Sequence, residues 1–217
     1  DAAARTRADK LVSLLIPVQK AYCTDRGFDA CVMAQQVLGG HGYVAEWGLE
    51  QNVRDARIAQ IYEGANGVQA LDLMGRKTVR ANGELLALLS EEMDAFVASQ
   101  AGVPAMQSYL VSLATCRKVL SDATLFVIDS AASNPEEIGA ASYAYMELMG
   151  LTLYCFMWQR ILAAALADKG GDNAEYLDGL VKVGEFFLAR QVPRVHSLLE
   201  EIEAGSESLM AMAANQF

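Results

Sequence analysis

The segment 36–77, QVLGGHGYVAEWGLEQNVRDARIAQIYEGANGVQALDLMGRK, carries the most specific information in this chain. It places one carboxylate, Glu63, in a turn between two stretches whose apolar residues recur at helical spacing, 52–62 and 66–82. A glycine cluster, GGHG at 39–42, precedes these stretches and interrupts the helical pattern. The segment therefore predicts two helices joined by a turn that presents Glu63.

Outward from this segment, helical spacing of apolar residues continues through almost the whole chain. No stretch alternates strictly between polar residues and Val, Ile or Thr, so we predict an all-α fold built of helical bundles. Asn82-Gly83 breaks the pattern and is the expected boundary between a first domain, 1–82, and a helical extension, 83–217. The remaining helices expected in the first domain are 3–21 and 25–38.

The extension has its own helix signals. The pattern restarts at Leu85, a second helix is expected over 104–132, and Asn134-Pro135 has the cap residue and first-turn proline of a third, reaching about residue 166. Gly170-Gly171-Asp172 is expected to end that helix. A last helix, 174–204 with a kink at Pro193, completes an antiparallel bundle.

Composition excludes some classes of function. The net charge of −10 repels a phosphate backbone, so no nucleic acid partner is expected, and it also disfavours attachment to a membrane surface. The most apolar stretch, 148–158, is shorter than the roughly 20 residues that span a bilayer, which indicates a core helix. The four cysteines form no CxxC pair and follow no secretory leader, so we expect buried thiols in a cytoplasmic protein.

Candidate chemistry concentrates on Glu63. Ile58, Ile61 and Tyr62 precede it and are expected to carry it toward the interior, where lost hydration strengthens a carboxylate as a base. Gln69 follows Asn66 by three residues, the spacing of a capping box. Taken alone, Glu63 fits a solvated or paired carboxylate better than a catalytic base, and the glycine cluster fits the end of a helix better than a cofactor loop.

Metal binding and nucleophilic catalysis find no support in the sequence. His41 has no second His or Cys at ligand spacing, so we expect it to be structural and expect no metal site. His196 lies on a long amphipathic stretch far from any candidate nucleophile. Arg54, Asp55 and Arg57 are expected to form a local ion-pair network.

Three blocks in this order and spacing, QVLGGHGY, EQNVRDARIAQIYEG and NGVQALDLMGRK, resemble the C-terminal helical domain of the flavin-dependent acyl-CoA dehydrogenases. The resemblance extends upstream through IPVQKAYCTDRGFDACVMAQQ and covers 3–77. The remainder looks like the helical extension of the 3-methylmercaptopropionyl-CoA dehydrogenase-like branch. The family's N-terminal helical domain and middle β-domain have no counterpart here, so we expect a C-terminal fragment of a longer enzyme that is inactive alone.

The resemblance implies FAD as cofactor and an acyl-CoA thioester as substrate. Glu63 matches the family's base, which removes the α-proton while a hydride from the β-carbon passes to FAD, giving a trans-2-enoyl-CoA as in fatty acid β-oxidation. The backbone N–H of Glu63 matches a donor to the thioester carbonyl, and Gly64 lets the substrate lie close to that backbone. An electron-transferring flavoprotein is the implied electron acceptor.

The resemblance also implies cofactor-binding residues. Gln36, Gly39 and Gly40 match the loop that contacts FAD, commonly the FAD of a neighbouring subunit, which implies a homo-oligomer. Ala65 and Gly67 match the turn that meets the adenosine diphosphate part of FAD. Ala65 departs from the family, which usually has threonine there, so one hydroxyl contact to the cofactor is missing. The alternatives are an acyl-CoA oxidase fragment, which returns electrons to oxygen, and a non-enzymatic helical module for oligomerisation or interaction.

Overall fold

The computed structural model describes residues 1–168 and 173–216, which form helices and no strand. The predicted all-α fold is therefore confirmed, while the expected helix end at 170–172 lies outside the described residues. In chain order the elements are α1 (Ala2–Val37), α2 (Gly40–Tyr43), η1 (Ala45–Trp47), α3 (Leu49–Ala59), α4 (Asn66–Leu71), η2 (Asp72–Val79), α5 (Glu84–Gln100), η3 (Pro104–Met106), α6 (Gln107–Ser133), α7 (Glu136–Ala167), α8 (Ala174–Arg190), α9 (Arg194–Glu203), α10 (Glu207–Met210) and η4 (Ala214–Gln216).

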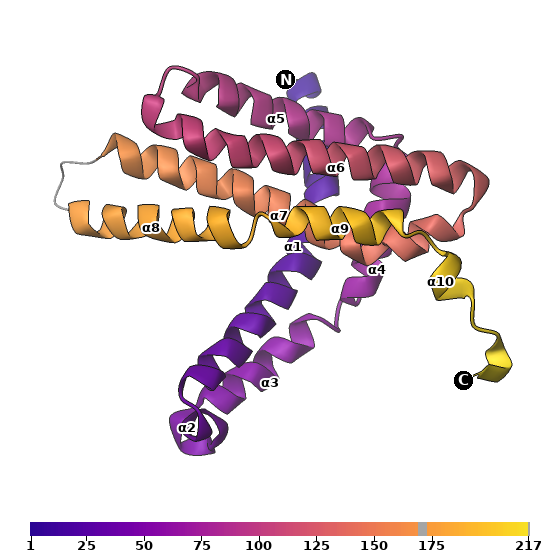
Figure 1. Ribbon diagram of the computed structural model, residues 1–217, viewed down its shortest axis with the longest axis horizontal. Helices are drawn as coiled ribbons and strands as arrows, with labels where there is room; N and C mark the ends of the chain where they lie inside the picture. The colour runs from indigo at the N-terminus through magenta and orange to yellow at the C-terminus, as the bar shows by residue number, and fades with distance from the viewer. Residues whose placement is uncertain (169–172, 217) are drawn as a thin grey trace.

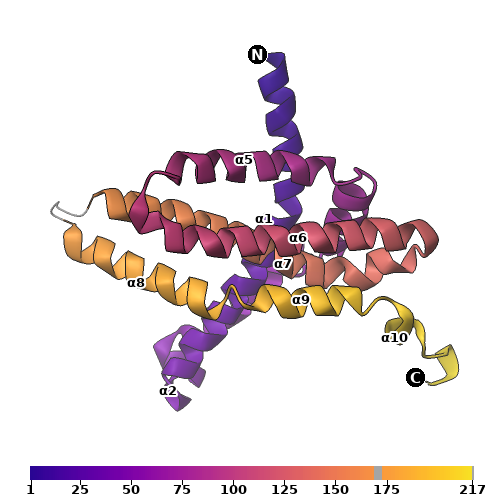
Figure 2. The same cartoon turned by 45° about the horizontal axis from the view of Figure 1, so that its top comes forward.

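The extension forms an antiparallel bundle. α5, α6, α7 and the end-to-end pair α8 and α9 run alongside one another, and α1 crosses them steeply (Figure 1, Figure 2). α7 packs against α6, α8, α9 and α1, and it contributes more buried side chains than any other described helix. One core cluster includes residues from α1, η2 and the extension, so the two predicted domains share a hydrophobic core. The boundary at 82 and 83 stays a prediction.

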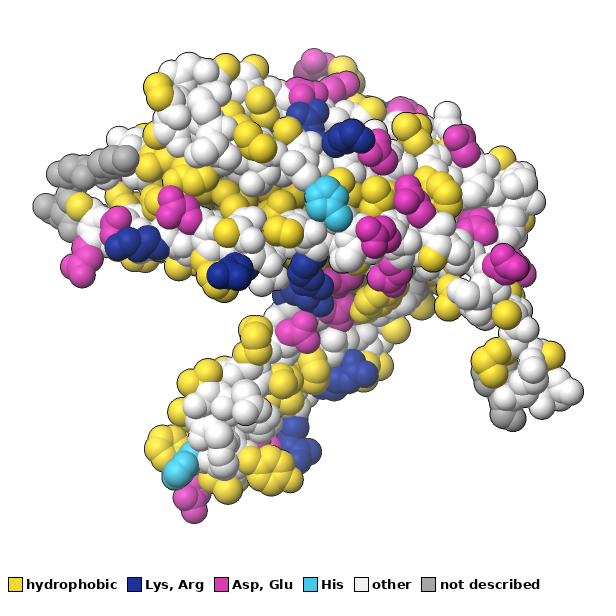
Figure 3. All heavy atoms as spheres, viewed as in Figure 1, with side chains coloured by type: hydrophobic (Ala, Val, Ile, Leu, Met, Phe, Trp, Pro, Cys, Tyr) yellow, Lys and Arg dark blue, Asp and Glu magenta, His cyan; other side chains and the backbone are white. Residues whose placement is uncertain are grey.

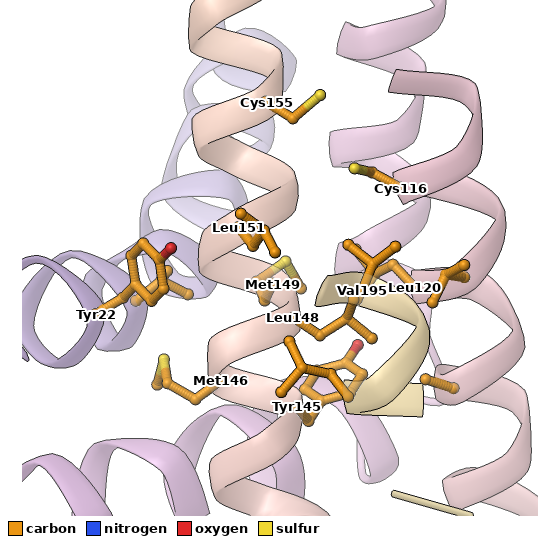
Figure 4. Packing of buried hydrophobic residues seen from close by; sticks show 14 of the residues in the cluster. Tyr22, Cys116, Leu120, Tyr145, Met146, Leu148, Met149, Leu151, Cys155 and Val195 are labelled. Carbon is orange, nitrogen blue, oxygen red and sulfur yellow. The ribbon is translucent and has the colours of Figure 1, made fainter. Parts of the chain in front are cut away.

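α1 and α7 cross at a glycine. A Cβ placed on Gly150 would lie 2.2 Å from the ring of Tyr22, so the aromatic ring occupies the space that any other residue would fill. Figure 4 shows Tyr22 beside α7 in the packed core. The hydroxyl of Tyr145 points to the opposite side of α7, where it shares a hydrogen bond of 2.7 Å with Thr124 of α6. α7 is therefore held between two layers, and its prediction as a core helix is confirmed over 148–158.

By length and composition α7 also meets the criteria for a helix that crosses a membrane, and it is the one described helix that does. More than half of its most apolar window is buried among the other helices of the chain.

Two helix boundaries differ from the predictions. α1 is continuous from Ala2 to Val37, whereas a break before Asp25 was expected. Thr24 donates its hydroxyl to the carbonyl of Lys20, and Asp25 bonds to side chains of other elements, so neither residue caps a new helix. The expected single helix 174–204 is broken into α8 and α9 at residues 191–193, because Pro193 cannot continue the hydrogen-bond ladder.

The helix expected over 66–82 changes type along its length. After α4 the chain widens into the π-helix η2, in which the hydroxyl of Thr78 donates to the carbonyl of Leu73, five residues earlier. Asn82 and Gly83 both have positive φ, 48° and 74°, and the chain turns there into α5. The pattern break at these two residues is therefore a real change of direction.

The cysteines divide into two pairs, and none is in a disulfide. Cys116 and Cys155 are buried and face each other between α6 and α7 (Figure 4), where hydrogen bonding to Cys155 and burial raise the pKa of the Cys116 thiol. The expectation of burial is wrong for Cys23, which is exposed, and for Cys31, which is partly exposed. Cys23 lies at the crossing of α1 and α7, where its sulfur accepts a hydrogen bond from the hydroxyl of Tyr154, and Cys31 lies two turns further along α1.

Replacing Gly150 with alanine should separate α1 from α7. The added methyl group would overlap the ring of Tyr22, so we expect the free energy of unfolding to fall by about 1–3 kcal/mol in urea titration. Gly139→Ala is the matched control on the same helix, because an added Cβ there meets nothing within 4 Å. It should stabilise the protein slightly, and equal losses for both variants would contradict the crossing geometry.

Removing the hydroxyl of Ser206 should change the titration of Glu137. Ser206 donates its hydroxyl to Glu137 at 2.6 Å, and this bond lowers the pKa of the Glu137 carboxyl. The lowered pKa stabilises the fold above the pKa of the unfolded chain, and this contribution is lost as the pH falls through the folded pKa. In Ser206→Ala the pKa of Glu137, followed by NMR, should rise toward its ordinary value, whereas Ser197→Ala, whose hydroxyl bonds its own helix, should leave it unchanged.

Candidate functional site

The segment that carries the candidate residues forms an arm outside the bundle. The second half of α1, the tip formed by α2 and η1, and the returning helix α3 make up this arm (Figure 1). Hydrophobic side chains cover much of its visible face (Figure 3). Val37 is 83% exposed, Tyr43 79% and Trp47 55%, so the residues that the structure describes leave this apolar surface without cover.

Glu63 occupies a strained turn between α3 and α4. Its φ is 52°, an unfavourable value for a residue with a Cβ, and Gly64 follows with φ 87°. The N–H of Asn66 donates to the carbonyl of Gln60 at 3.1 Å and closes the turn. Within the described chain neither Glu63 nor Gly64 donates its backbone N–H to an acceptor. The turn thus presents a carboxylate and two free N–H donors together.

The environment of Glu63 differs from the expectation. Ile58, Ile61 and Tyr62 are 55%, 51% and 51% exposed, and Glu63 itself is exposed, so the prediction that they carry it into the interior is wrong for this chain. The reason is that α3 packs against α1 and otherwise lies outside the bundle. The carboxylate faces outward, where another domain or a ligand has room to approach.

The capping box expected at Asn66 and Gln69 is absent. Ala65 is the cap of α4, and Asn66 already lies inside the helix. Asn66 is 5% exposed and directs its amide away from α4, donating to the carboxylate of Asp25 at 2.7 Å and accepting from Lys20 at 2.7 Å. The side chain of Gln69 instead lies against Gly64, 2.7 Å from the position of an added Cβ. Asn66 therefore ties the turn to α1.

The glycine cluster forms the tip of the arm. Gly39 has φ 55° and is the N-cap of α2, and a Cβ on Gly39 or Gly40 would meet nothing within 4 Å. Gly42 is buried, and an added Cβ would lie 2.1 Å from the carbonyl oxygen of Gln35, so α2 packs closely on α1 there. Gln36 is exposed beside the open backbone of Gly39 and Gly40.

The predicted cofactor-binding residues form two groups rather than one. Gln36, Gly39 and Gly40 lie at the tip, whereas Ala65 and Gly67 lie at the start of α4, beyond the other end of α3. An 11-residue helix spans about 16 Å, so the two groups are well separated. All five are exposed, and the backbone of Gly67 is open in the same way as that of Gly40.

The remaining candidates have structural contacts. His41 packs edge-on against Trp47 with ring centroids 5.2 Å apart, and no metal-binding cluster occurs among residues 1–168 and 173–216. The network expected among Arg54, Asp55 and Arg57 is wrong in its partners. Each of the three bonds instead to a neighbour along the chain, to Glu50, Gln51 and Gln60 respectively.

Three residues beside the turn, Asp25, Gln60 and Tyr143, were not identified from the sequence. Asp25 is 6% exposed and accepts hydrogen bonds from Gln60 of the turn and from Tyr143 of α7. The one available signal was the position of Asp25 four residues after Ala21, on the apolar face of an amphipathic helix, where an unpaired carboxylate is unusual. Nothing in the sequence connects it to Tyr143.

Comparison with known proteins places these residues in a family. Residues 1–77 match the family described as acyl-CoA dehydrogenase, C-terminal domain, and residues 89–213 match the one described as acetyl-CoA dehydrogenase C-terminal like. The helical domain with its Glu63 turn is thus that of an acyl-CoA dehydrogenase, followed by an associated helical extension. This chain belongs to the acyl-CoA dehydrogenase family.

Similar proteins carry related names. The chain is 33% identical over 87% of its length to a 3-methylmercaptopropionyl-CoA dehydrogenase of Ruegeria pomeroyi, covering 32% of that protein. It is 30% identical over 94% of its length to the broad-specificity linear acyl-CoA dehydrogenase FadE5 of Mycobacterium tuberculosis, covering 35% of it. Over 30% of the chain it is 40% identical to a mitochondrial isobutyryl-CoA dehydrogenase of Bos taurus, covering 15% of it. The chain spans about a third of the length of the first two.

Gly64→Ala should destabilise the turn through its backbone. The φ of 87° costs an L-residue about 1–2 kcal/mol, while the end of the Gln69 side chain is free to move aside. We expect a matching loss in the free energy of unfolding, measured by urea titration. The control is Gly67→Ala, which has helical backbone and open space around it and should not lose stability. A neutral Gly64→Ala would contradict the strained turn.

Proposed function

We propose that this chain is the C-terminal part of a longer FAD-dependent acyl-CoA dehydrogenase, which converts an acyl-CoA thioester to a trans-2-enoyl-CoA with Glu63 as the base. The observation that carries the proposal is the turn itself. In a chain of this family, it holds one exposed carboxylate next to backbone N–H groups that have no partner among the described residues.

The turn suits proton removal from a thioester. An α-proton is weakly acidic, and it becomes easier to remove when hydrogen bonds stabilise negative charge on the carbonyl oxygen. The free N–H of Glu63 is a donor for that oxygen, and the carboxylate of the same residue is the acceptor for the proton. Gly64 lacks a side chain that would block the approach. The exposed carboxylate would become desolvated once substrate and the remaining domains cover it.

The open backbone of the arm supports FAD as the cofactor. When bound, FAD supplies the acceptor for the hydride from the β-carbon of the substrate. Gln36 with Gly39 and Gly40 would hold one part of a cofactor molecule, and Ala65 with Gly67 another part or a second molecule. Ala65 has no hydroxyl to offer, so the contact at this position is limited to the backbone.

The exposed apolar surface of the arm also bears on the proposed partners. The uncovered apolar side chains of the arm support contact with the remaining domains or with a neighbouring subunit of a homo-oligomer. An electron-transferring flavoprotein is proposed as electron acceptor. Peroxide formation by the full-length protein would instead identify an oxidase.

Flavin reduction by acyl-CoA tests the role of Glu63. In the full-length protein, Glu63→Gln removes the base while nearly preserving its shape, so the rate of flavin bleaching should fall at least about 100-fold. Glu46→Gln is the control, because Glu46 is also an exposed carboxylate on the arm. A panel of acyl-CoA chain lengths in the same assay defines the preferred substrate.

Two results would contradict this proposal. The first is a full-length protein that holds no flavin after purification, and the second is a Glu63→Gln variant whose flavin is reduced as fast as that of the unmodified protein. In either case a non-enzymatic helical interaction module becomes the better description of this chain.

A further inference from the structure

The carboxylate of Asp25 is buried beside the turn that carries Glu63. It lies on α1, is 6% exposed, and forms no ion pair with any described residue. Three neutral donors surround it: the amides of Asn66 and Gln60 and the hydroxyl of Tyr143. A buried charge is costly unless hydrogen bonds replace its hydration, and these three bonds do so.

One oxygen atom of this carboxylate holds both ends of the turn. Oδ1 accepts from Gln60 at 2.6 Å and from Asn66 at 2.7 Å. Gln60 ends α3, Asn66 begins α4, and the backbone hydrogen bond between them closes the turn. Glu63 lies midway between these two residues and makes no hydrogen bond of its own among the described residues. Its position is therefore set by the two ends.

The other oxygen of Asp25 reaches the extension. Oδ2 accepts from the hydroxyl of Tyr143, which lies on α7 within the region matched by the second family. The ring of Tyr143 is half exposed, whereas its hydroxyl is directed to the carboxylate. α7 is also the central helix of the extension bundle. Asp25 thus joins the Glu63 turn to α7, which has more buried residues than any other described helix.

We propose that Asp25 is a positioning residue for Glu63, and that Tyr143 completes the clamp from the extension, an inference that rests on the proposed function of Glu63. The extension then has a part in the chemistry, because it fixes the turn that presents the base. Tight geometry matters here, since a displacement of about 1 Å at a reacting group costs up to about 100-fold in rate.

The test uses the full-length flavin-containing protein with four variants. Asp25→Ala removes both carboxylate oxygens, Asp25→Asn keeps an acceptor for Gln60 and Asn66, and Tyr143→Phe removes the extension's donor alone. Tyr145→Phe is the control, since it is the same change on the same helix and its hydroxyl bonds Thr124 on the far side of α7 (Figure 4). Two quantities are measured. The first is the rate of flavin reduction per bound flavin at saturating acyl-CoA, and the second is hydrogen exchange at the backbone N–H of Asn66, which closes the turn.

We expect Asp25→Ala to slow reduction by roughly tenfold or more, Tyr143→Phe by a few-fold, and Asp25→Asn to recover most of the rate. Hydrogen exchange at the backbone N–H of Asn66 should become faster in Asp25→Ala and Tyr143→Phe and stay unchanged in Tyr145→Phe. If Asp25→Ala does not fold, Tyr143→Phe alone decides the outcome. A merely structural clamp would lower flavin content or stability and leave the rate per bound flavin at its original value, which would overturn the inference.

Glu63→Gln in the same series separates the two proposals. Loss of reduction in Glu63→Gln with unchanged rates in Asp25→Ala and Tyr143→Phe overturns the positioning role alone. Unchanged reduction in Glu63→Gln overturns the proposed function itself.

Discussion

The crossing of α1 over α7 is the contact on which the remaining structure depends. Tyr22 fits over Gly150 only because glycine leaves that space open, and the ring meets Tyr154 edge-on one turn further along α7. On the other side of Gly150, Arg26 bonds Glu147 at 3.2 Å and Asp25 bonds Tyr143. Residues 143, 147, 150 and 154 share one face of α7, because they follow helical spacing. A change in the crossing would therefore move the arm, the ion pair and the Asp25 contact together.

The ion pair shows how this crossing tolerates a buried charge. Burial raises the pKa of Glu147, while Arg26 from α1 and Arg194 from α9 act in the opposite direction. Charges in such a position contribute little net stability, because the lost hydration offsets the attraction. Their value here is geometric, since Glu147 bonds correctly only when α1 and α9 lie at defined positions along α7. The buried carboxylate of Asp25 is instead stabilised by neutral donors, two from the turn and one from α7, rather than by another charge.

How far the sequence predicts this fold depends on the range of each interaction. Helical spacing identifies the long helices, and Asn82-Gly83 and Asn134-Pro135 mark real ends, because caps and positive φ are local properties. Two predictions, a helix that starts at Asp25 and a capping box at Asn66, are wrong for one shared reason. Both residues have side chains typical of helix caps, yet they bond to each other across 41 residues. A local pattern cannot distinguish a cap from a tertiary contact made by the same side chain.

The candidate site likewise has local features that the sequence predicts and tertiary contacts that it does not. Glu63 and its glycine are found from the sequence because the motif is contiguous, whereas the residues that hold the turn come from α1 and α7 and have no common pattern. The expectation that Glu63 faces the interior is wrong because it requires Ile61 and Tyr62 to pack within this chain, whereas both are half exposed on the arm. Large exposed apolar patches mark surfaces that contact other proteins, ligands or membranes. The arm therefore combines a turn fixed from within by Asp25 with an apolar face that the described residues leave exposed. Under the proposed function, the remaining domains or a neighbouring subunit would cover that face and complete the environment of Glu63.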